Sequence, residues 1–598
     1  MLRRISENLY RFEDTCNVYI LRSGPDAILI DFGTGDVLDA LPQIGVDRIT
    51  DVLITHHHRD QVQGLPRAVA EGIRIWVPAP EQELFTRAEE RRSARGVLNN
   101  YNTREDRFSI ISSVPIAGGI PEYVPTRYGP ITVTAIPLPG HTVGSVGFLL
   151  DVDGRRAAFT GDLIAGPGKV WSLAATQWSY AGPEGLAASV LSLLDLRDRG
   201  PDLLLPSHGP VMDDPPSAID LTVGRLRELL ELRKQHREVV TRRERPFEHI
   251  TPHLLYNRVA HSKSYILLSD SGKALVVDYG YDLDYGLPAG TDRAARRPWL
   301  YTLPTLKRQF GVERIDVAIP THYHDDHVAA FNLLRDVEGT SLWVPANFAD
   351  VLAHPSRYNL PCLWYDPIEA DTVVPLGERI SWEEHELVVH PLPGHTLYAV
   401  AIELTVDGTK VLFTGDQHDD ERRLNYVYQN RFRIDDYRTS GELYVRLQPE
   451  ILLTGHWGPI PTAGGLLEDF RDRGVELERL HRELLPLDEA DFDAEGAGAW
   501  IRPYESEVAP GEEMFLEVEV RNPAASREEV AVTLTGPPGW TLQPPSAAVT
   551  LDPGEHSWLK FDVMVPDIPA VHRAVLTADL RVGDRRYGQG AEALVTIR

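Results

Sequence analysis

Imidazole and carboxylate side chains gather in one short run of the second half of the chain. His322 and His324 are two residues apart, and Asp326 and His327 follow directly. Side chains of the same types recur later, each beside a glycine: His395, Asp416 and His456. Imidazole and carboxylate groups are the usual ligands of borderline divalent cations. Because glycine lets the backbone bend, each of these side chains can point into a common pocket. The pattern therefore predicts a metal centre.

The first half of the chain repeats this pattern. Six blocks of sequence recur in the same order in the two halves, and the distance along the chain from His141 to Asp162 equals that from His395 to Asp416. One position differs, because Gln61 stands where the second half has His327. A glutamine carbonyl is a weaker ligand than imidazole, so we expect one metal ion here, or two with the second held loosely. The first-half candidates are His56, His58, Asp60, Gln61, His141, Asp162 and His208.

Short apolar strands must position these side chains. The runs Ile28–Ile30 and Val317–Ile319 each end in a polar loop, and helical patterns lie between such runs. Strands that alternate with helices, with polar groups at the strand ends, predict layered sheets covered by outer helices. We predict an α/β class, with one lobe over residues 1–240, a second over 241–490, and both built on the same fold.

The last part of the chain, residues 497–598, has a different character. Pro-Gly turns separate runs of alternating apolar and polar residues, such as Met514–Val520. Short alternating strands between turns predict an all-β sandwich resembling immunoglobulin-like modules. Since the segment contains no cluster of catalytic residue types, we expect it to be dispensable for chemistry.

Composition limits the partners. Asp and Glu number 88 against 60 Lys and Arg, for a formal charge of −28. Such a surface repels phosphate backbones and anionic lipid headgroups, so we expect neither a nucleic-acid nor a membrane partner. The chain has 2 cysteines, no run of the ~20 apolar residues that a membrane helix needs, and no signal-peptide pattern at Met1. We expect a cytoplasmic protein with a small-molecule substrate; the sequence leaves its oligomeric state open.

The order of motifs resembles a known family. Thr-His-x-His-x-Asp-His from Thr321, Pro-Gly-His-Thr around His395, Thr-Gly-Asp ending at Asp416 and Gly-His at His456 are similar to the metallo-β-lactamase superfamily. The resemblance covers roughly residues 10–215 and 250–465 and implies two tandem αββα lobes. It also implies the ligand sets: His322, His324 and His395 for one metal, and Asp326, His327 and His456 for another, with Asp416 bridging both.

The resemblance also implies the cofactors and supporting residues. It indicates two divalent ions in the second lobe, zinc foremost with iron or manganese as alternatives, and one or two more weakly bound ions in the first lobe. Asp326 would orient the attacking water or accept its proton, and Asp416 would hold both ions. Asp278, with its first-lobe match Asp31, resembles a strand-end aspartate that supports a ligand from behind.

The function that follows is metal-dependent hydrolysis of a small ester, thioester or lactone by a metal-bound hydroxide, with catalysis in the second lobe. Glyoxalase II-like and lactonase-like members are similar, although Val328-Ala329-Ala330 replaces their usual Gly-Gly. One alternative is a mononuclear non-haem iron enzyme of the persulfide dioxygenase type, which uses two histidines and one carboxylate. Another is a largely non-catalytic binding protein with a decayed first lobe.

Overall fold

The computed structural model of the protein describes residues 1–96, 98, 108–178, 184–280, 302–431, 433–487, 490–491 and 498–598. The chain divides into two compact units. The first is Met1–Phe247 with Val259–His261 and the described part of Tyr281–Val312, and the second is Glu248–Arg258, Ser262–Gly280 and Glu313–Arg598. The second unit thus holds the C-terminal segment as well as most of the second lobe. The domain boundaries drawn from the sequence stay a prediction, and residues 492–497 lie outside the described part.

The first lobe contains two sheets. One keeps its strands in chain order: β1 (Leu2–Arg4), β2 (Leu9–Glu13), β3 (Asn17–Ser23), β4 (Asp26–Ile30), β5 (Arg48–Leu53), β6 (Arg74–Pro78) and β7 (Gly118–Ile120). The other has the order β12-β11-β10-β9-β8, with β8 (Thr126–Tyr128), β9 (Ile131–Pro137), β10 (Val146–Val152), β11 (Arg155–Gly161) and β12 (Leu203–Pro206). Pairing changes from antiparallel to parallel at β4–β5 and again at β11–β12.

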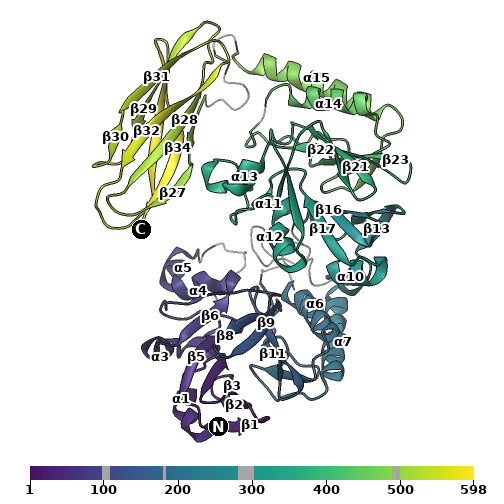
Figure 1. Cartoon of the computed structure of the whole chain (residues 1–598), viewed down its shortest axis with the longest axis vertical. Helices are drawn as coiled ribbons and strands as arrows, with labels where there is room; N and C mark the ends of the chain where they lie inside the picture. Colours follow the sequence, from purple (N-terminus) through teal and green to yellow (C-terminus); the bar gives the residue numbers. More distant parts are fainter. Residues whose placement is uncertain are drawn as a thin grey trace. The chain divides into compact units, whose positions relative to one another are not determined.

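Helices cover the outer faces of these sheets, as Figure 1 shows for α6 and α7 beside β9 and β11. The helical segments are α1 (Val37–Ala40), η1 (Leu41–Ile44), α2 (Arg59–Val62), α3 (Leu65–Ala70), η2 (Ala79–Glu81), α4 (Gln82–Thr86), α5 (Ala88–Ala94), α6 (Glu184–Asp198), α7 (Pro215–Arg233) and α8 (Val239–Glu244). Leu149 packs with Leu191 and Leu226 beneath α6 and α7. Between the two sheets, the Tyr19 and Phe159 rings meet edge to face at 5.2 Å. This is the predicted αββα layering.

The second lobe repeats the arrangement. One sheet runs in chain order through β13 (Phe247–Thr251), β14 (Leu254–Asn257), β15 (Tyr265–Leu268), β16 (Lys273–Val277), β17 (Arg314–Ile319), β18 (Ser341–Pro345) and β19 (Thr372–Val374). The other contains β20 (Arg379–Trp382), β21 (His385–Pro391), β22 (Val400–Val406), β23 (Thr409–Gly415), β24 (Ile451–Thr454) and β25 (Pro459–Pro461). Tyr265 and Phe413 meet between the sheets at 5.4 Å, in the same relation as Tyr19 and Phe159.

The helical segments of this part of the chain are α10 (Thr302–Phe310), α11 (Asp325–Val328), α12 (Phe331–Leu333), η4 (Leu334–Glu338), α13 (Ala349–Ala353), η5 (Pro355–Arg357), α14 (Asp436–Leu447) and α15 (Leu466–Leu484). Leu412 of β23 packs against Tyr444 of α14 and Phe470 of α15. The outer face of the second sheet is therefore buried beneath α14 and α15. Among the described residues, no helix combines the length and the apolar character needed to cross a membrane.

The C-terminal segment is a β-sandwich, as predicted. One sheet has the order β26-β28-β32-β30, and the other β27-β34-β33-β29-β31. The strands are β26 (Ala499–Arg502), β27 (Glu505–Val508), β28 (Glu513–Arg521), β29 (Glu528–Thr535), β30 (Thr541–Gln543), β31 (Ser546–Leu551), β32 (His556–Met564), β33 (Val571–Val582) and β34 (Arg585–Ile597). Val518 and Phe561 of one sheet pack with Val532 and Leu580 of the other, which confirms the alternating pattern.

Candidate metal centres

Strand-end loops of the second lobe bring its seven candidates together. His322 and His324 follow β17, and Asp326 and His327 lie in the short helix α11 that begins at Asp325. The other three lie on turns of the second sheet: His395 between β21 and β22, Asp416 after β23, and His456 after β24. Both sheets therefore contribute loops to the same edge of the lobe, where parallel strands end.

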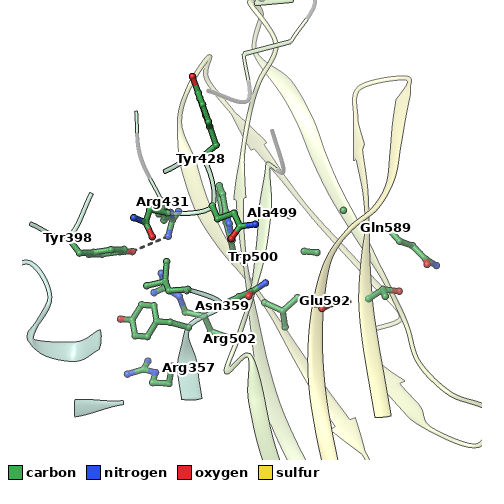
Figure 2. Close-up of a pocket in the computed structure, with 18 residues that line it drawn as sticks. Arg357, Asn359, Tyr398, Tyr428, Arg431, Ala499, Trp500, Arg502, Gln589 and Glu592 are labelled. Atoms are coloured by element: carbon green, nitrogen blue, oxygen red, sulfur yellow. Dashed lines mark hydrogen bonds between the residues drawn. The ribbon is translucent and has the colours of Figure 1, made fainter. Parts of the chain in front are cut away.

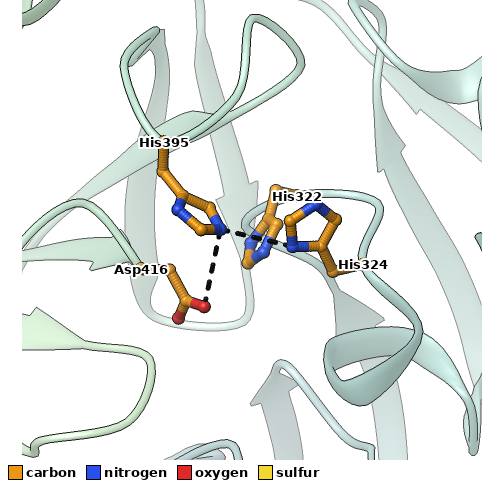
Figure 3. A group of neighbouring side chains, drawn as sticks. All are labelled: His322, His324, His395 and Asp416. Atoms are coloured by element: carbon orange, nitrogen blue, oxygen red, sulfur yellow. Dashed lines mark hydrogen bonds and ion pairs between the residues drawn. The ribbon is translucent and has the colours of Figure 1, made fainter. Parts of the chain in front are cut away.

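Asp416 is the centre of the cluster. Its carboxylate oxygens lie 3.2 Å from His327 Nε2, 3.0 Å from His456 Nε2 and 3.7 Å from His395 Nε2. His395 Nε2 in turn lies 3.3 Å from His324 Nδ1. Figure 3 shows the rings of His322, His324 and His395 turned toward one another, with Asp416 beside them. A single ion could contact one atom from each of these four side chains, because those atoms lie within 4.8 Å of one another.

Two of the seven candidates, Asp326 and His456, lie nearer the surface than the others. Asp326 Oδ2 is 3.3 Å from His456 Nε2 and 3.7 Å from His327 Nε2. Asp326 and His456 are partly exposed, whereas His322, His324, His327, His395 and Asp416 are buried. A substrate would therefore approach from the side of Asp326 and His456.

The histidines of the cluster differ in their pKa values. Burial, together with neighbouring imidazoles, lowers the pKa of His324 to about 3 and that of His322 well below its usual value. Burial also lowers the pKa of His395. Burial acts in the same direction on His456, but Asp416 and Asp326 outweigh it and raise its pKa to about 10. The rings of His322, His324 and His395 are thus neutral at pH 7, the state in which imidazole binds a metal. The carboxylates of Asp416 and Asp326 instead favour positive charge on His456.

The residues fit a metal pair on two further grounds. The Nε2 atoms of His322 and His324 are buried and have no hydrogen-bond partner among the described residues. Gly455 has no room for a side chain, because a Cβ there would lie 1.9 Å from Asp416 Oδ1 and 2.8 Å from the His327 ring. Unpaired buried nitrogens are costly unless an ion completes them. We conclude that this donor set suits divalent cations.

Asp278 fixes the direction of His327. Its carboxylate accepts from His327 Nδ1 at 2.9 Å and from the Thr321 backbone and hydroxyl at 2.7 and 2.8 Å. With Nδ1 donating, His327 presents Nε2 to Asp416. Ser262 plays a comparable part for Asp326, since its hydroxyl lies 3.0 Å from Asp326 Oδ2. Asp278 thus lies where the sequence places a supporting aspartate.

The first lobe brings its candidates together as well. His141 Nε2 lies 2.9 Å from His58 Nδ1 and 3.4 Å from Asp162 Oδ2, and His56 Nε2 lies 3.5 Å from the same oxygen. Burial lowers the pKa of His56 to about 3, and it also lowers that of His141. A three-histidine group beside a carboxylate is therefore present here too, with His56 and His141 neutral at pH 7, and it suits one ion.

The remaining first-lobe positions are occupied differently. Gln61 Nε2 donates to Asp162 at 3.2 Å and to Asp60 at 3.3 Å. His208 presents Nδ1 to Asp162 at 2.7 Å, and its Nε2 lies 3.1 Å from the Thr15 carbonyl. Gln61 as a weak carbonyl ligand stays a prediction: its amide nitrogen faces the carboxylates, and its buried Oε1 has no hydrogen-bond partner among the described residues. Asp60, Asp162 and His208 also offer one atom each within 4.8 Å of one another, so a loosely held second ion in this lobe stays a prediction.

Aromatic and charged groups that the repeat did not reveal surround the first-lobe cluster. The Trp171 ring stacks on His208 with centroids 3.8 Å apart and planes 2° apart, and 52% of Trp171 is exposed. Phe108 lies edge to face with His58 at 5.3 Å. On the buried side, His57 Nδ1 lies 3.1 Å from Glu81 Oε1. No sequence signal marks these contacts, since each of them involves a residue whose type does not recur at the matching position of the second lobe.

Two residues follow Asp416 closely in the sequence, and only the first of them, Gln417, supports the cluster, a role that sequence reasoning missed. The Gln417 side chain accepts from the His395 backbone at 3.0 Å and donates to the Pro393 carbonyl at 2.9 Å. It therefore supports the turn that carries His395. His418, which is close to Asp416 in the sequence, does not line the cluster; it is buried and stacks on Phe470 at 3.7 Å.

Comparison with known families agrees with this geometry. Residues 11–208 and 258–456 match the metallo-beta-lactamase superfamily, and each stretch contains one of the clusters. Residues 508–583 match the NPCBM-associated, NEW3 domain of alpha-galactosidase, within the sandwich. The resemblance stated from the sequence and the predicted fold class are both confirmed.

Individual relatives are distant. The chain is 26% identical to an atrochrysone carboxyl ACP thioesterase of Aspergillus fumigatus (strain ATCC MYA-4609 / CBS 101355 / FGSC A1100 / Af293) over 35% of this chain and 55% of that protein. It is 26% identical to a beta-lactamase-like protein 2 homolog of Caenorhabditis elegans over 38% and 68%. Among solved structures, BJP-1, a subclass B3 metallo-beta-lactamase of Bradyrhizobium japonicum, matches 40% of this chain and 94% of its own at 19% identity, with a TM-score of 0.31. The chain thus spans about half the length of the first of these relatives.

Proposed function

We propose that this chain, which belongs to the metallo-β-lactamase superfamily, is a metal-dependent hydrolase whose second lobe cleaves a small thioester, ester or lactone. The observation that carries the proposal is the position of Asp416, within 3.7 Å of nitrogen atoms from three histidines. A buried carboxylate among imidazole nitrogens is a typical donor set for divalent cations. The thioesterase name of the Aspergillus relative supports thioesters as the first class to test.

In this proposal His322, His324 and His395 would hold one divalent ion, and Asp326, His327 and His456 a second, with Asp416 shared. Zinc suits the mixture of imidazole and carboxylate ligands. Ions bound there would polarise the scissile carbonyl and lower the pKa of water to ~7.

The chain's own residues do the rest. Asp326 lies at the exposed side of the cluster, where it can accept a proton from the attacking water. His456 and His327 outweigh the effect of burial and lower the pKa of Asp326, so Asp326 is an anion at neutral pH. Ser262 holds Oδ2 of that carboxylate in place. Asp278, through His327, keeps the ligand ring directed at Asp416.

Hydrolysis of a panel of thioesters, lactones, β-lactams and phosphodiesters by the zinc-loaded protein tests the proposal, with elemental analysis of the same sample. We expect turnover of one of the first two classes, close to two metal ions in the second lobe, and loss of turnover in Asp416→Ala. One iron per chain with oxygen consumption on a persulfide would favour the dioxygenase alternative instead. No turnover and no bound metal would contradict both.

A further inference from the structure

One loop of the second lobe holds His395 at both its ring and its backbone. The His395 Nδ1–H donates to the Asn425 carbonyl at 3.0 Å, and Asn430 Nδ2 donates to the His395 carbonyl at 2.7 Å. The Arg431 carbonyl accepts from the Leu397 amide at 2.6 Å. All three partners lie between β23 and α14. Since Nδ1 is fixed by a carbonyl, the placement of this loop decides where His395 Nε2 points.

The side chain of Arg431 ties the same loop to the β-sandwich. Its guanidinium carbon lies 4.1 Å from the centroid of the Trp500 ring, and its Nη2 lies 3.4 Å from Glu519 Oε2. Its Nη1 donates to the Tyr398 hydroxyl at 3.3 Å (Figure 2). The side chains of Arg431 and Glu519 are only 14% and 13% exposed, so this ion pair is poorly screened by water. Breaking one partner of a buried pair leaves an uncompensated charge.

Glu519 is built into the sandwich surface as an anion. Arg502 Nη2 lies 3.4 Å from its Oε2, and His556 Nδ1 lies 3.5 Å from its Oε1. Burial favours the neutral acid, but His556, Arg431 and Arg502 outweigh it and lower the pKa of Glu519. The carboxylate therefore faces Arg431 with its charge at neutral pH.

These contacts are not embedded in a closely packed interface. A cavity of about 370 Å³ lies among them, lined from the lobe by Tyr398 and Arg431 and from the sandwich by Trp500, Arg502 and Glu592 (Figure 2). None of the candidate metal ligands lines it. The Trp500 ring and the Glu519 carboxylate both contact Arg431 from the sandwich side.

We propose that Trp500 and Glu519 are positioning residues for the second-lobe metal centre, and that they act on His395 through Arg431 and its loop. This rests on the proposed function, in that His395 is taken as a metal ligand. It also replaces the expectation that residues 497–598 are dispensable for chemistry. The matching first-lobe histidine lacks this support: among the described residues, the buried His141 Nδ1 has no hydrogen-bond partner.

Full-length variants in a His58→Ala background, which weakens the first-lobe site, test the proposal. Zinc affinity is measured by competition with a chelator, and ligand geometry by the visible absorption of the cobalt-substituted protein. We expect Glu519→Gln and Trp500→Ala to weaken zinc binding by about 10-fold, the lower end of what partners behind a metal ligand contribute, and to alter the cobalt spectrum. Trp500→Phe keeps a ring face for Arg431, so this variant should retain the zinc affinity and the cobalt spectrum of the parent.

Glu517→Gln is the matched control. Glu517 lies on the same strand and face of the sandwich as Glu519, but it pairs with Lys560 at 3.6 Å. Zinc affinity and cobalt spectra equal to the parent in both Glu519→Gln and Trp500→Ala would overturn the proposal. If Trp500→Ala does not fold, the nearly isosteric Glu519→Gln decides. A parent protein that binds no zinc refutes the proposed function and the positioning role together, whereas a parent that binds zinc alongside unaffected variants refutes only the positioning role.

Discussion

The side-chain amide of Gln61 donates to the Asp162 carboxylate across 3.2 Å, where the second lobe has an imidazole nitrogen 3.2 Å from Asp416. A donating amide nitrogen does not bind a cation, so in this orientation Gln61 adds no ligand beside Asp162. In the second lobe, Asp278 fixes the corresponding ring of His327; in the first, Asp31 accepts from Thr55 and Ser207 instead.

We predict from this difference that the first lobe holds one tightly bound ion and the second lobe two. Gln61→His should raise the metal content by about one ion per chain, because an imidazole would replace the amide donor. Elemental analysis after exhaustive dialysis measures this. Gln61→Ala, which removes the amide without adding a ligand, should leave the content unchanged. Equal metal content in Gln61→His and wild type would contradict the prediction.

Catalysis should depend on the second lobe. We expect Asp416→Ala or His395→Ala to lower kcat by more than about 100-fold, because partners behind the ligands alone are worth ~10–100-fold. The matched first-lobe changes, Asp162→Ala and His141→Ala, should leave a substantial fraction of the turnover. Steady-state kinetics of the four folded variants provides the test. The opposite ranking would assign the chemistry to the first lobe.

Activity should also require metal. Removal of divalent ions by a chelator is expected to abolish turnover, since the polar side chains that converge in the second lobe form a donor set suited to divalent cations. Zinc, or another divalent ion in excess, should restore it. Kinetics before and after dialysis measure both steps, and full activity in a sample shown by elemental analysis to be metal-free would exclude the mechanism.

Asp278→Asn should weaken metal binding specifically in the second lobe. The substitution keeps the shape of the side chain but removes the charge that accepts from His327 Nδ1 at 2.9 Å. We expect about a 10-fold loss in affinity for the second ion, measured by chelator competition. Asp31→Asn is the matched control, because Asp31 makes no hydrogen bond to Gln61, and it should change metal affinity less. Similar losses in both variants would show that the two aspartates act only on folding.

The first lobe should lose stability in acid through Glu81. Burial would raise the pKa of this carboxyl, but His57 and Thr142 outweigh burial and lower it from 4.5 to about 2. A carboxyl whose folded pKa is depressed stabilises the fold above its unfolded pKa and loses that contribution as the pH falls through the folded value. The free energy of unfolding should therefore fall between about pH 4.5 and 2.

Glu81→Gln should flatten that pH dependence, and Glu83→Gln, at an exposed position of α4, should not. Chemical denaturation followed by fluorescence at several pH values between 2 and 5 measures the effect. An unchanged slope in Glu81→Gln would show that other groups cause the acid sensitivity.

The sequence by itself determined the repeat, layered sheets with outer helices and the cluster of candidates, and its resemblance to the metallo-β-lactamase superfamily implied the αββα order of the layers. Apolar runs such as Val317–Ile319 predicted buried strands, and polar residues directly after them were expected at one edge of a sheet. The alternating residues of 514–520 determined the sandwich in the same way. Asp278 was also identified from its position after a strand, because the repeat with Asp31 marked it.

Tertiary structure decided the features that depend on side-chain direction. The repeat could say that Gln61 replaces His327, but only the folded chain shows which amide atom faces Asp162. Asn425 and Asn430 belong to the loop between β23 and α14, whose sequence does not repeat that between β11 and α6, so no internal comparison could indicate their hold on His395. The link from Glu519 to Arg431 spans distant parts of the sequence, and hydrogen bonds and ion pairs of that kind leave no periodic pattern along the chain, because they depend on how separate elements pack.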